Sequence, residues 1–225
     1  MAQVPITANH CPGAVMYRVD CAGLGSLSRL HTGDFRFDSR WHAPPGCPYL
    51  SDIQEVYLDT ECANPESPPF PTKEESCRLL CSLIKQHGKG KTIYLCPRFY
   101  GYEDLLLAVS KEFGERVFVD VDAAGASNRT EGFQGMLRNL ICNIPELRDA
   151  VTGDPLHKTR FHAGIYPPKG ILADSALKIY FFPPYFLKED EAGCPPPEHR
   201  IWAEEDLQGL DCEANIELHY SLHSS

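Results

Sequence analysis

ANHCPGAVM at residues 8–16 and HTGDFR at residues 31–36 are the two stretches around which this chain is organised. The asparagine, proline and glycine beside His10 predict a sharp turn, with a strand leaving it. Gly33 lets the chain turn at the end of a returning strand, so Asp34 should project beyond the sheet edge. An imidazole and a carboxylate presented on neighbouring loops of one sheet are suited to bind a metal ion.

These residue types also have simpler interpretations. A histidine beside a Pro-Gly turn is usually structural or solvated, and an aspartate in a Gly-Asp turn commonly serves the turn itself. The residues alone leave both interpretations open. In this order, however, the two motifs resemble the third and fourth metal motifs of the metallo-β-lactamase-type DNA nucleases of the β-CASP group. The resemblance implies that His10 and Asp34 are metal ligands.

Composition narrows the class of protein. The 225 residues, 43% of them hydrophobic, can bury the core of one large or two small domains. A net charge of -10 argues against non-specific electrostatic binding of the whole surface to nucleic acid. The sequence has no apolar run of about 18 residues and no secretory signal pattern, so we expect no membrane span.

The ten cysteines are scattered without a C-x-x-C pair, and this predicts reduced thiols in a cytosolic or nuclear protein. A zinc site made by Cys77, Cys81 and His87 is the weaker alternative. Buried cysteines on the apolar face of a helix are common, and the sequence offers no evident fourth ligand there.

A third motif follows a predicted strand at residues 53–58. The strand ends in LDTEC at residues 58–62, which places Asp59 at a strand terminus, where both functional acids and turn aspartates occur. LDTEC resembles the first β-CASP motif, and SDIQEVY at residues 51–57 is most similar to the branch of the family that contains Artemis. The resemblance implies that Asp59 orients a metal ligand through a hydrogen bond.

The middle of the chain alternates predicted strands and helices. A capping box formed by Thr72 and Glu75 starts a helix that should end at Gly88, and a second helix should end at Gly114. Strand, helix, strand, helix, strand at these lengths predicts βαβ units with a parallel sheet. In family terms this block resembles the β-CASP cap, which lies over the metal site. Residues 183–200 are proline-rich and acidic, and predict a loop.

The last motif is SLHSS at residues 221–225, after a predicted strand at residues 216–221. It resembles the second β-CASP motif. That resemblance implies a place at the metal site for His223, as ligand or proton donor. It also places Ser224 and Ser225 beside a substrate phosphate at a helix N-terminus.

The resemblance implies an α/β fold: a partial metallo-β-lactamase fold, a mixed β-sheet sandwiched by helices, with an inserted α/β β-CASP domain. We expect the C-terminal part of the metallo-β-lactamase core at residues 1–62, the cap at residues 63–215 and a return strand to the core at residues 216–225. The family's H-x-H-x-D-H motif does not occur in the sequence. The chain is therefore expected to be a fragment, a partial gene product or a truncated isoform, with weak or absent metal binding and little catalysis on its own.

For the complete protein, the resemblance implies a metal-dependent nuclease that hydrolyses DNA phosphodiester bonds with two metal ions, expected to be Zn²⁺. Asp34, Asp59 and His223 would be catalytic, and His10, Asp34 and His223 would hold metal. The implied setting is the nucleus, in double-strand break repair by non-homologous end joining or in interstrand cross-link repair. DNA is the expected partner, with DNA-dependent protein kinase as a further one through a tail outside this sequence.

Two other functions stay open: an RNA-processing β-CASP nuclease and a non-catalytic DNA-repair binding or scaffold module. The sequence does not decide between exonuclease and endonuclease activity.

Overall fold

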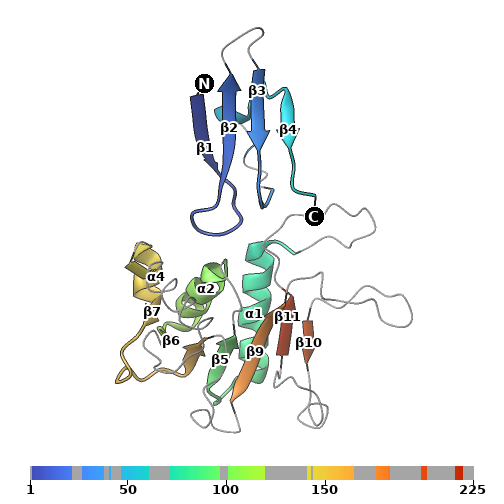
Figure 1. Ribbon diagram of the computed structural model, residues 1–225. Coiled ribbons are helices and arrows are strands. Elements are labelled where there is room, and N and C mark those ends of the chain that lie inside the picture. Colours follow the sequence, from blue (N-terminus) through green and yellow to red (C-terminus); the bar gives the residue numbers. More distant parts are fainter. Residues whose placement is uncertain are drawn as a thin grey trace, which may run out of the picture. The chain divides into compact units, whose positions relative to one another are not determined.

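A computed structural model describes residues 2–21, 27–37, 41, 47–60, 71–96, 101–119, 141–142, 144–164, 176–182, 199–201 and 216–219. The described residues form two compact units, one up to residue 60 and the other from residue 71 onward. Figure 1 shows a sheet in each unit and helices in the second, so the chain is mixed α/β as predicted. Among the described helices, none is both long and apolar enough to cross a membrane.

The first unit contains a four-stranded sheet in the order β1-β2-β3-β4. Its strands are β1 (Ala2–Thr7), β2 (Val15–Cys21), β3 (Leu27–His31) and β4 (Glu55–Tyr57). The pairs β1/β2 and β2/β3 are antiparallel, whereas β3/β4 is parallel. The sequence analysis predicts β2, β3 and β4 and makes no prediction for residues 2–7, where β1 contains Pro5. Proline is tolerated there because β1 lies at the sheet edge.

One face of this sheet carries the core of the first unit. Buried residues Ile6, Met16 and Leu30 pack there with Ala8. The connecting segment also contributes partly buried side chains to this core, namely those of Phe35, Trp41, Cys47, Leu50 and Ile53. The sequence predicts a surface loop over residues 38–50, but the structure has the short helix η2 (Pro48–Leu50) there. Pro48 stands at the first position of this short helix, where the fixed φ angle of proline favours a helical turn.

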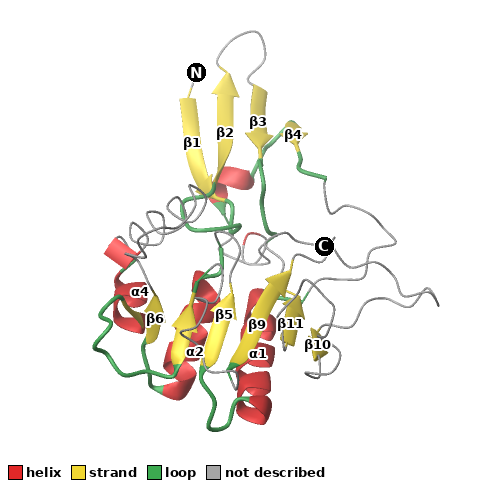
Figure 2. Ribbon diagram, turned by 60° about the horizontal axis from the view of Figure 1, so that its bottom comes forward, coloured by secondary structure: helices red, strands yellow, loops and turns green. Residues whose placement is uncertain are grey.

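The second unit contains a seven-stranded sheet in the order β10-β11-β9-β5-β8-β6-β7. Its strands are β5 (Ile93–Cys96), β6 (Val117–Val119), β7 (Val151–Thr152), β8 (Phe161–Ala163), β9 (Leu177–Phe182), β10 (His199–Ile201) and β11 (Ile216–His219). Every neighbouring pair is parallel except β10/β11. Figure 2 shows the helices lying against this sheet, which confirms the predicted βαβ arrangement.

The helices of the second unit are α1 (Lys73–His87), α2 (Glu103–Phe113) and α4 (Pro145–Ala150). The predicted capping box is present, because the Glu75 amide donates to Thr72 Oγ1 at 3.1 Å and the Thr72 amide donates to Glu75 Oε2 at 2.8 Å. At Gly88 a Cβ atom would lie 2.6 Å from the Ile93 side chain. Gly114 has a left-handed backbone with φ +66°. Both predicted helix ends are therefore confirmed.

Two segments near the end of the chain differ from expectation. Residues 199–201 form β10, although the sequence predicts a loop through residue 200. Residues 216–219 form β11, which pairs in parallel with β9 in the second unit's sheet, where the sequence predicts a strand returning to the first unit's fold. The edge of β9 offers a ladder of backbone partners that sequence reasoning did not foresee. His223, Ser224 and Ser225 lie outside the described residues.

Candidate metal-binding site

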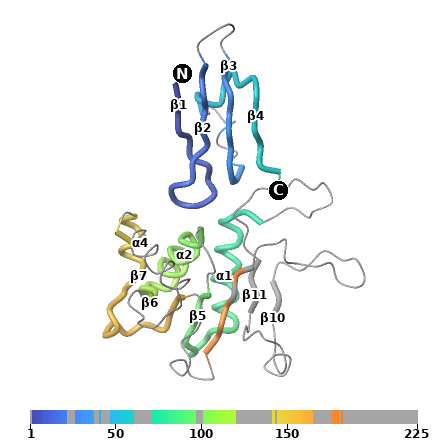
Figure 3. Tube along the Cα trace, viewed as in Figure 1, coloured from blue at the N-terminus to red at the C-terminus, as the bar shows by residue number. Residues whose placement is uncertain are grey.

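His10 lies on a tight loop that joins β1 to β2, and Figure 3 shows this loop at the end of the first sheet. The Ala8 amide donates to the Ala14 carbonyl at 3.0 Å, and the Ala14 amide donates to the Cys11 carbonyl at 3.0 Å. Asn9 and Gly13 have positive φ angles of 54° and 86°. These left-handed residues reverse the chain within a few positions, so His10 lies on a sharp turn, as predicted.

The loop that follows β3 brings Asp34 to the same end of the sheet. Gly33 has a φ angle of 53°, which turns the chain out of the strand. The Arg36 amide donates to the Ala8 carbonyl at 2.8 Å and so fastens this loop to the one that carries His10. As a result, His10 Nε2 and Asp34 Oδ2 lie 4.0 Å apart. The structure therefore brings together the first two predicted ligands.

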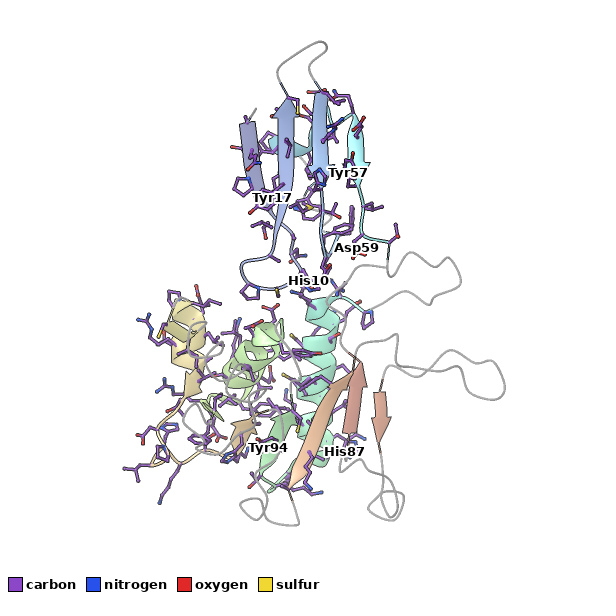
Figure 4. All side chains as sticks on the ribbon, in the orientation of Figure 1. His10, Tyr17, Tyr57, Asp59, His87 and Tyr94 are labelled. Carbon is purple, nitrogen blue, oxygen red and sulfur yellow. The ribbon has the colours of Figure 1, made fainter. Side chains whose placement is uncertain are left out.

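Thr32 connects these loops to the end of β4. Its side chain is buried, its amide donates to the Tyr57 carbonyl at 3.0 Å, and its hydroxyl donates to the same carbonyl at 3.3 Å. The Asp59 amide in turn donates to Thr32 Oγ1 at 3.0 Å. Figure 4 shows His10 and Asp59 at the same end of the first sheet. Sequence reasoning assigned no role to Thr32, although a hydroxyl directly before a Gly-Asp turn at a strand end is a signal for such a link.

The histidine and carboxylate pair fits the chemistry of a zinc ion. Nitrogen and oxygen ligands lie about 2 Å from zinc in a tetrahedral arrangement, so two ligands of one ion are about 3.3 Å apart. The 4.0 Å separation of His10 Nε2 and Asp34 Oδ2 is wider than this, so the two side chains must move closer together to hold one ion. Asp34 is 70% exposed and His10 14% exposed, so an ion can reach the pair from solvent.

A complete set of ligands is not assembled by these residues. Within the described ranges, no group of three or more His, Cys, Asp or Glu side chains is arranged to hold a metal ion. His223, the third predicted ligand, falls beyond those ranges. The described residues thus include two candidate ligands, fewer than the four of a closed zinc site.

The alternative zinc site at Cys77 and Cys81 receives no support. Burial raises the pKa of the Cys77 thiol to about 12 and that of the Cys81 thiol to about 11. These raised pKa values mean that both thiols are protonated at neutral pH in the absence of a metal ion. Neither belongs to a metal-binding group among the described residues.

Sequence comparisons identify relatives of the chain, although no family model matches it. Protein artemis of Rattus norvegicus is 35% identical over 170 residues, which are 72% of this chain and 21% of that protein. The DNA cross-link repair protein SNM1 of Arabidopsis thaliana is 31% identical over 118 residues, 51% of this chain and 24% of that protein. DNA ligase 6 of Arabidopsis thaliana is 33% identical over 120 residues, 52% of this chain and 8% of that protein.

The matched region thus spans 21% of the length of rat Artemis and 24% of that of SNM1. The chain is a homologue of Artemis and SNM1, which confirms the prediction that it belongs with the β-CASP DNA-repair nucleases of the Artemis type.

Proposed function

We propose that this chain contributes the metal-binding edge of a metal-dependent DNA nuclease that acts in DNA repair. The observation that carries the proposal is the 4.0 Å approach of His10 Nε2 to Asp34 Oδ2 on two loops joined by a backbone hydrogen bond. The homology to Artemis and to a DNA cross-link repair protein supports DNA as the substrate. In this proposal the first unit is part of a metallo-β-lactamase fold and the second is a β-CASP cap.

Each residue of the site has a distinct role in this proposal. Neutral His10 offers a nitrogen lone pair, and Asp34 offers a carboxylate to zinc. A bound metal ion would polarise the phosphate group of the substrate and would lower the pKa of a water molecule bound to it. Thr32 holds the backbone of Asp59 beside the loop that carries Asp34. The carboxyl group of Asp59 is proposed to orient a ligand.

The proposal also covers residues 223–225 and the cellular setting of the protein. His223 is proposed as a ligand or proton donor, and Ser224 with Ser225 as contacts for a substrate phosphate. We propose two zinc ions, a nuclear location, and a pathway of either non-homologous end joining or cross-link repair. If the pathway is end joining, we propose DNA-dependent protein kinase as a partner.

The first experiment is native mass spectrometry of the chain titrated with zinc, beside the His10→Ala and Asp34→Ala variants. Exposed His157 provides the control substitution His157→Ala. Because the described residues supply only two ligands, we expect weak zinc binding that both site variants abolish and the control retains. Zinc binding that is the same in all four proteins would contradict the proposed site.

Activity distinguishes the DNA nuclease from the RNA nuclease. The chain with added zinc would be assayed on DNA and RNA strands of the same sequence, with Asp34→Ala as the inactive control. Cleavage of DNA that depends on Asp34 supports the proposal, whereas cleavage of RNA alone assigns the chain to the RNA-processing group.

A non-catalytic DNA-repair module is the second candidate. It is favoured by the presence of only two candidate ligands among the described residues. A chain that stays metal-free at saturating zinc and cleaves neither nucleic acid would support this candidate over the nuclease.

A further inference from the structure

A pocket of about 190 Å³ lies in the second unit, at the N-terminal ends of β6 and β7 and beside α4. Figure 1 shows these three elements together at one side of the unit. Two arginines, Arg116 and Arg148, line the pocket together with Cys142, Val151 and Thr152. This pocket is separate from His10 and Asp34, which belong to the first unit.

Backbone carbonyls hold both guanidinium groups in place. Arg116 Nη2 donates to the carbonyl of Arg148 at 2.7 Å, and Arg148 Nη2 donates to the carbonyl of Cys142 at 2.8 Å. These contacts fix the position of the two side chains, but a carbonyl does not neutralise a cation. The two positive charges are therefore pre-positioned at one pocket.

The described lining of the pocket provides no compensating negative charge. None of the described residues that line it is an aspartate or glutamate. Arg116 Nε is buried and has no hydrogen-bond partner in the part of the chain that the structure describes. A buried donor without an acceptor is costly, and two guanidinium groups at one pocket repel each other. An anion at this pocket would satisfy the Arg116 Nε donor and offset the two positive charges.

We propose that the Arg116–Arg148 pocket binds a phosphate group. The guanidinium fork donates paired hydrogen bonds that match the oxygens of phosphate, and arginine keeps its charge at all physiological pH values. Val151 and Ile141 give the pocket apolar walls, which strengthen a charged hydrogen bond by reducing competition from water. Arg148 is exposed, so its remaining donors can reach an anion that enters from solvent.

The test is calorimetric titration of the full chain with inorganic phosphate, at constant ionic strength and with a chelator present so that no metal can bind the phosphate. The variants are Arg148→Gln and Arg116→Gln, and the control is Lys91→Gln, which removes one exposed positive charge elsewhere in the same unit. We expect each arginine variant to weaken phosphate binding about tenfold, as the loss of a hydrogen bond to a charged group does, and the control to bind normally.

A purely structural role for the arginines makes a different prediction. In that case the variants would lose thermal stability while any phosphate affinity stayed unchanged, and this result would overturn the proposal. Absence of phosphate binding by the unaltered chain would also overturn it. Arg116→Lys adds a further check, because it keeps the charge but not the fork, and it should bind phosphate less tightly than arginine. If Arg116→Gln does not fold, Arg148→Gln on the exposed side of the pocket still decides the matter.

A second titration identifies the source of the phosphate. A short single-stranded DNA would be bound to the chain and then challenged with inorganic phosphate. Displacement of the DNA in the unaltered chain, but not in Arg148→Gln, assigns the pocket to the nucleic-acid backbone. Binding of phosphate without displacement of DNA assigns it to a free phosphate group. A zinc site that fails at His10 leaves both results unaffected, so the two proposals fail independently.

Discussion

Thr32 is the residue through which the ends of β3 and β4 are linked at the candidate site. Its hydroxyl accepts from the Asp59 amide and donates to the Tyr57 carbonyl. We expect Thr32→Val, which preserves shape, to lower the free energy of unfolding by about 1–3 kcal/mol, because the Asp59 amide loses its acceptor.

Urea unfolding followed by tryptophan fluorescence measures the effect of Thr32→Val, in a chain that carries Trp202→Phe so that Trp41 alone reports on the first unit. Thr60→Val at an exposed position is the matched control and should leave the midpoint unchanged. The role assigned to Thr32 would be wrong if the two variants unfolded at the same urea concentration.

Glu103 provides a pH-dependent test at the start of α2. Burial raises the pKa of its carboxyl group, whose ordinary value is 4.5. A raised pKa means that the folded state binds this proton more tightly than the unfolded state. The stability contributed by Glu103 is therefore present below its unfolded pKa and is lost as pH rises through the folded pKa.

Glu103→Gln keeps an oxygen that can accept from the Gly101 amide but removes the titration. Relative to the unaltered chain, we expect the variant to gain thermal stability at pH 7 and to lose this advantage as pH falls toward 4.5. Melting temperatures at several pH values measure the difference. The control is Glu74→Gln, an exposed carboxylate in α1. A constant difference across pH for Glu103→Gln would contradict the assignment.

At the scale of elements, the capping box at the start of α1 makes a local contribution to stability that can be measured. Thr72→Ala removes the acceptor of the Glu75 amide and is expected to cost about 1 kcal/mol of unfolding free energy. Thr72→Ser keeps a hydroxyl and should cost much less. Chemical denaturation of the two variants tests this, and equal losses would mean that the cap contributes through packing instead.

Elements that the sequence predicts well are those defined by short-range patterns. The helix α1 begins at a capping box and ends at a glycine, and both signals lie within a few residues of the boundary. No prediction covers β1, and its position at the sheet edge, which makes Pro5 acceptable, depends on the whole sheet. The pairing of β11 with β9 is likewise a long-range property that residues 216–219 do not encode alone.

For the whole molecule, net charge limits how DNA can be bound. At a net charge of -10 the chain should bind single-stranded DNA through few phosphate contacts. If the arginine pocket holds one phosphate, the logarithm of the affinity should fall against the logarithm of salt concentration with a slope of about −0.7. Fluorescence polarisation over a range of salt concentrations measures this slope. A slope several times steeper would show an extended basic surface that composition does not predict.

The candidate site was predictable in part. The order of motifs containing His10, Asp34 and Asp59 predicts that these residues meet at one sheet edge, and the structure brings His10 and Asp34 within 4.0 Å. The hydrogen bond from Arg36 to Ala8 that joins their loops was not predictable, because backbone contacts between distant segments leave no pattern in side chains. Whether His223 completes the site stays a prediction, since it lies outside the described residues.

The sequence by itself determined the alternation of strands and helices and the helix ends, because these depend on local periodicity and turn chemistry. The family and the candidate ligands came from the resemblance of its short motifs to those of known nucleases. Only the tertiary structure decided the order of the strands, the link made by Thr32, and the meeting of Arg116 with Arg148 across 32 positions of sequence. Such contacts depend on which distant surfaces pack together, and local side-chain preferences do not specify that.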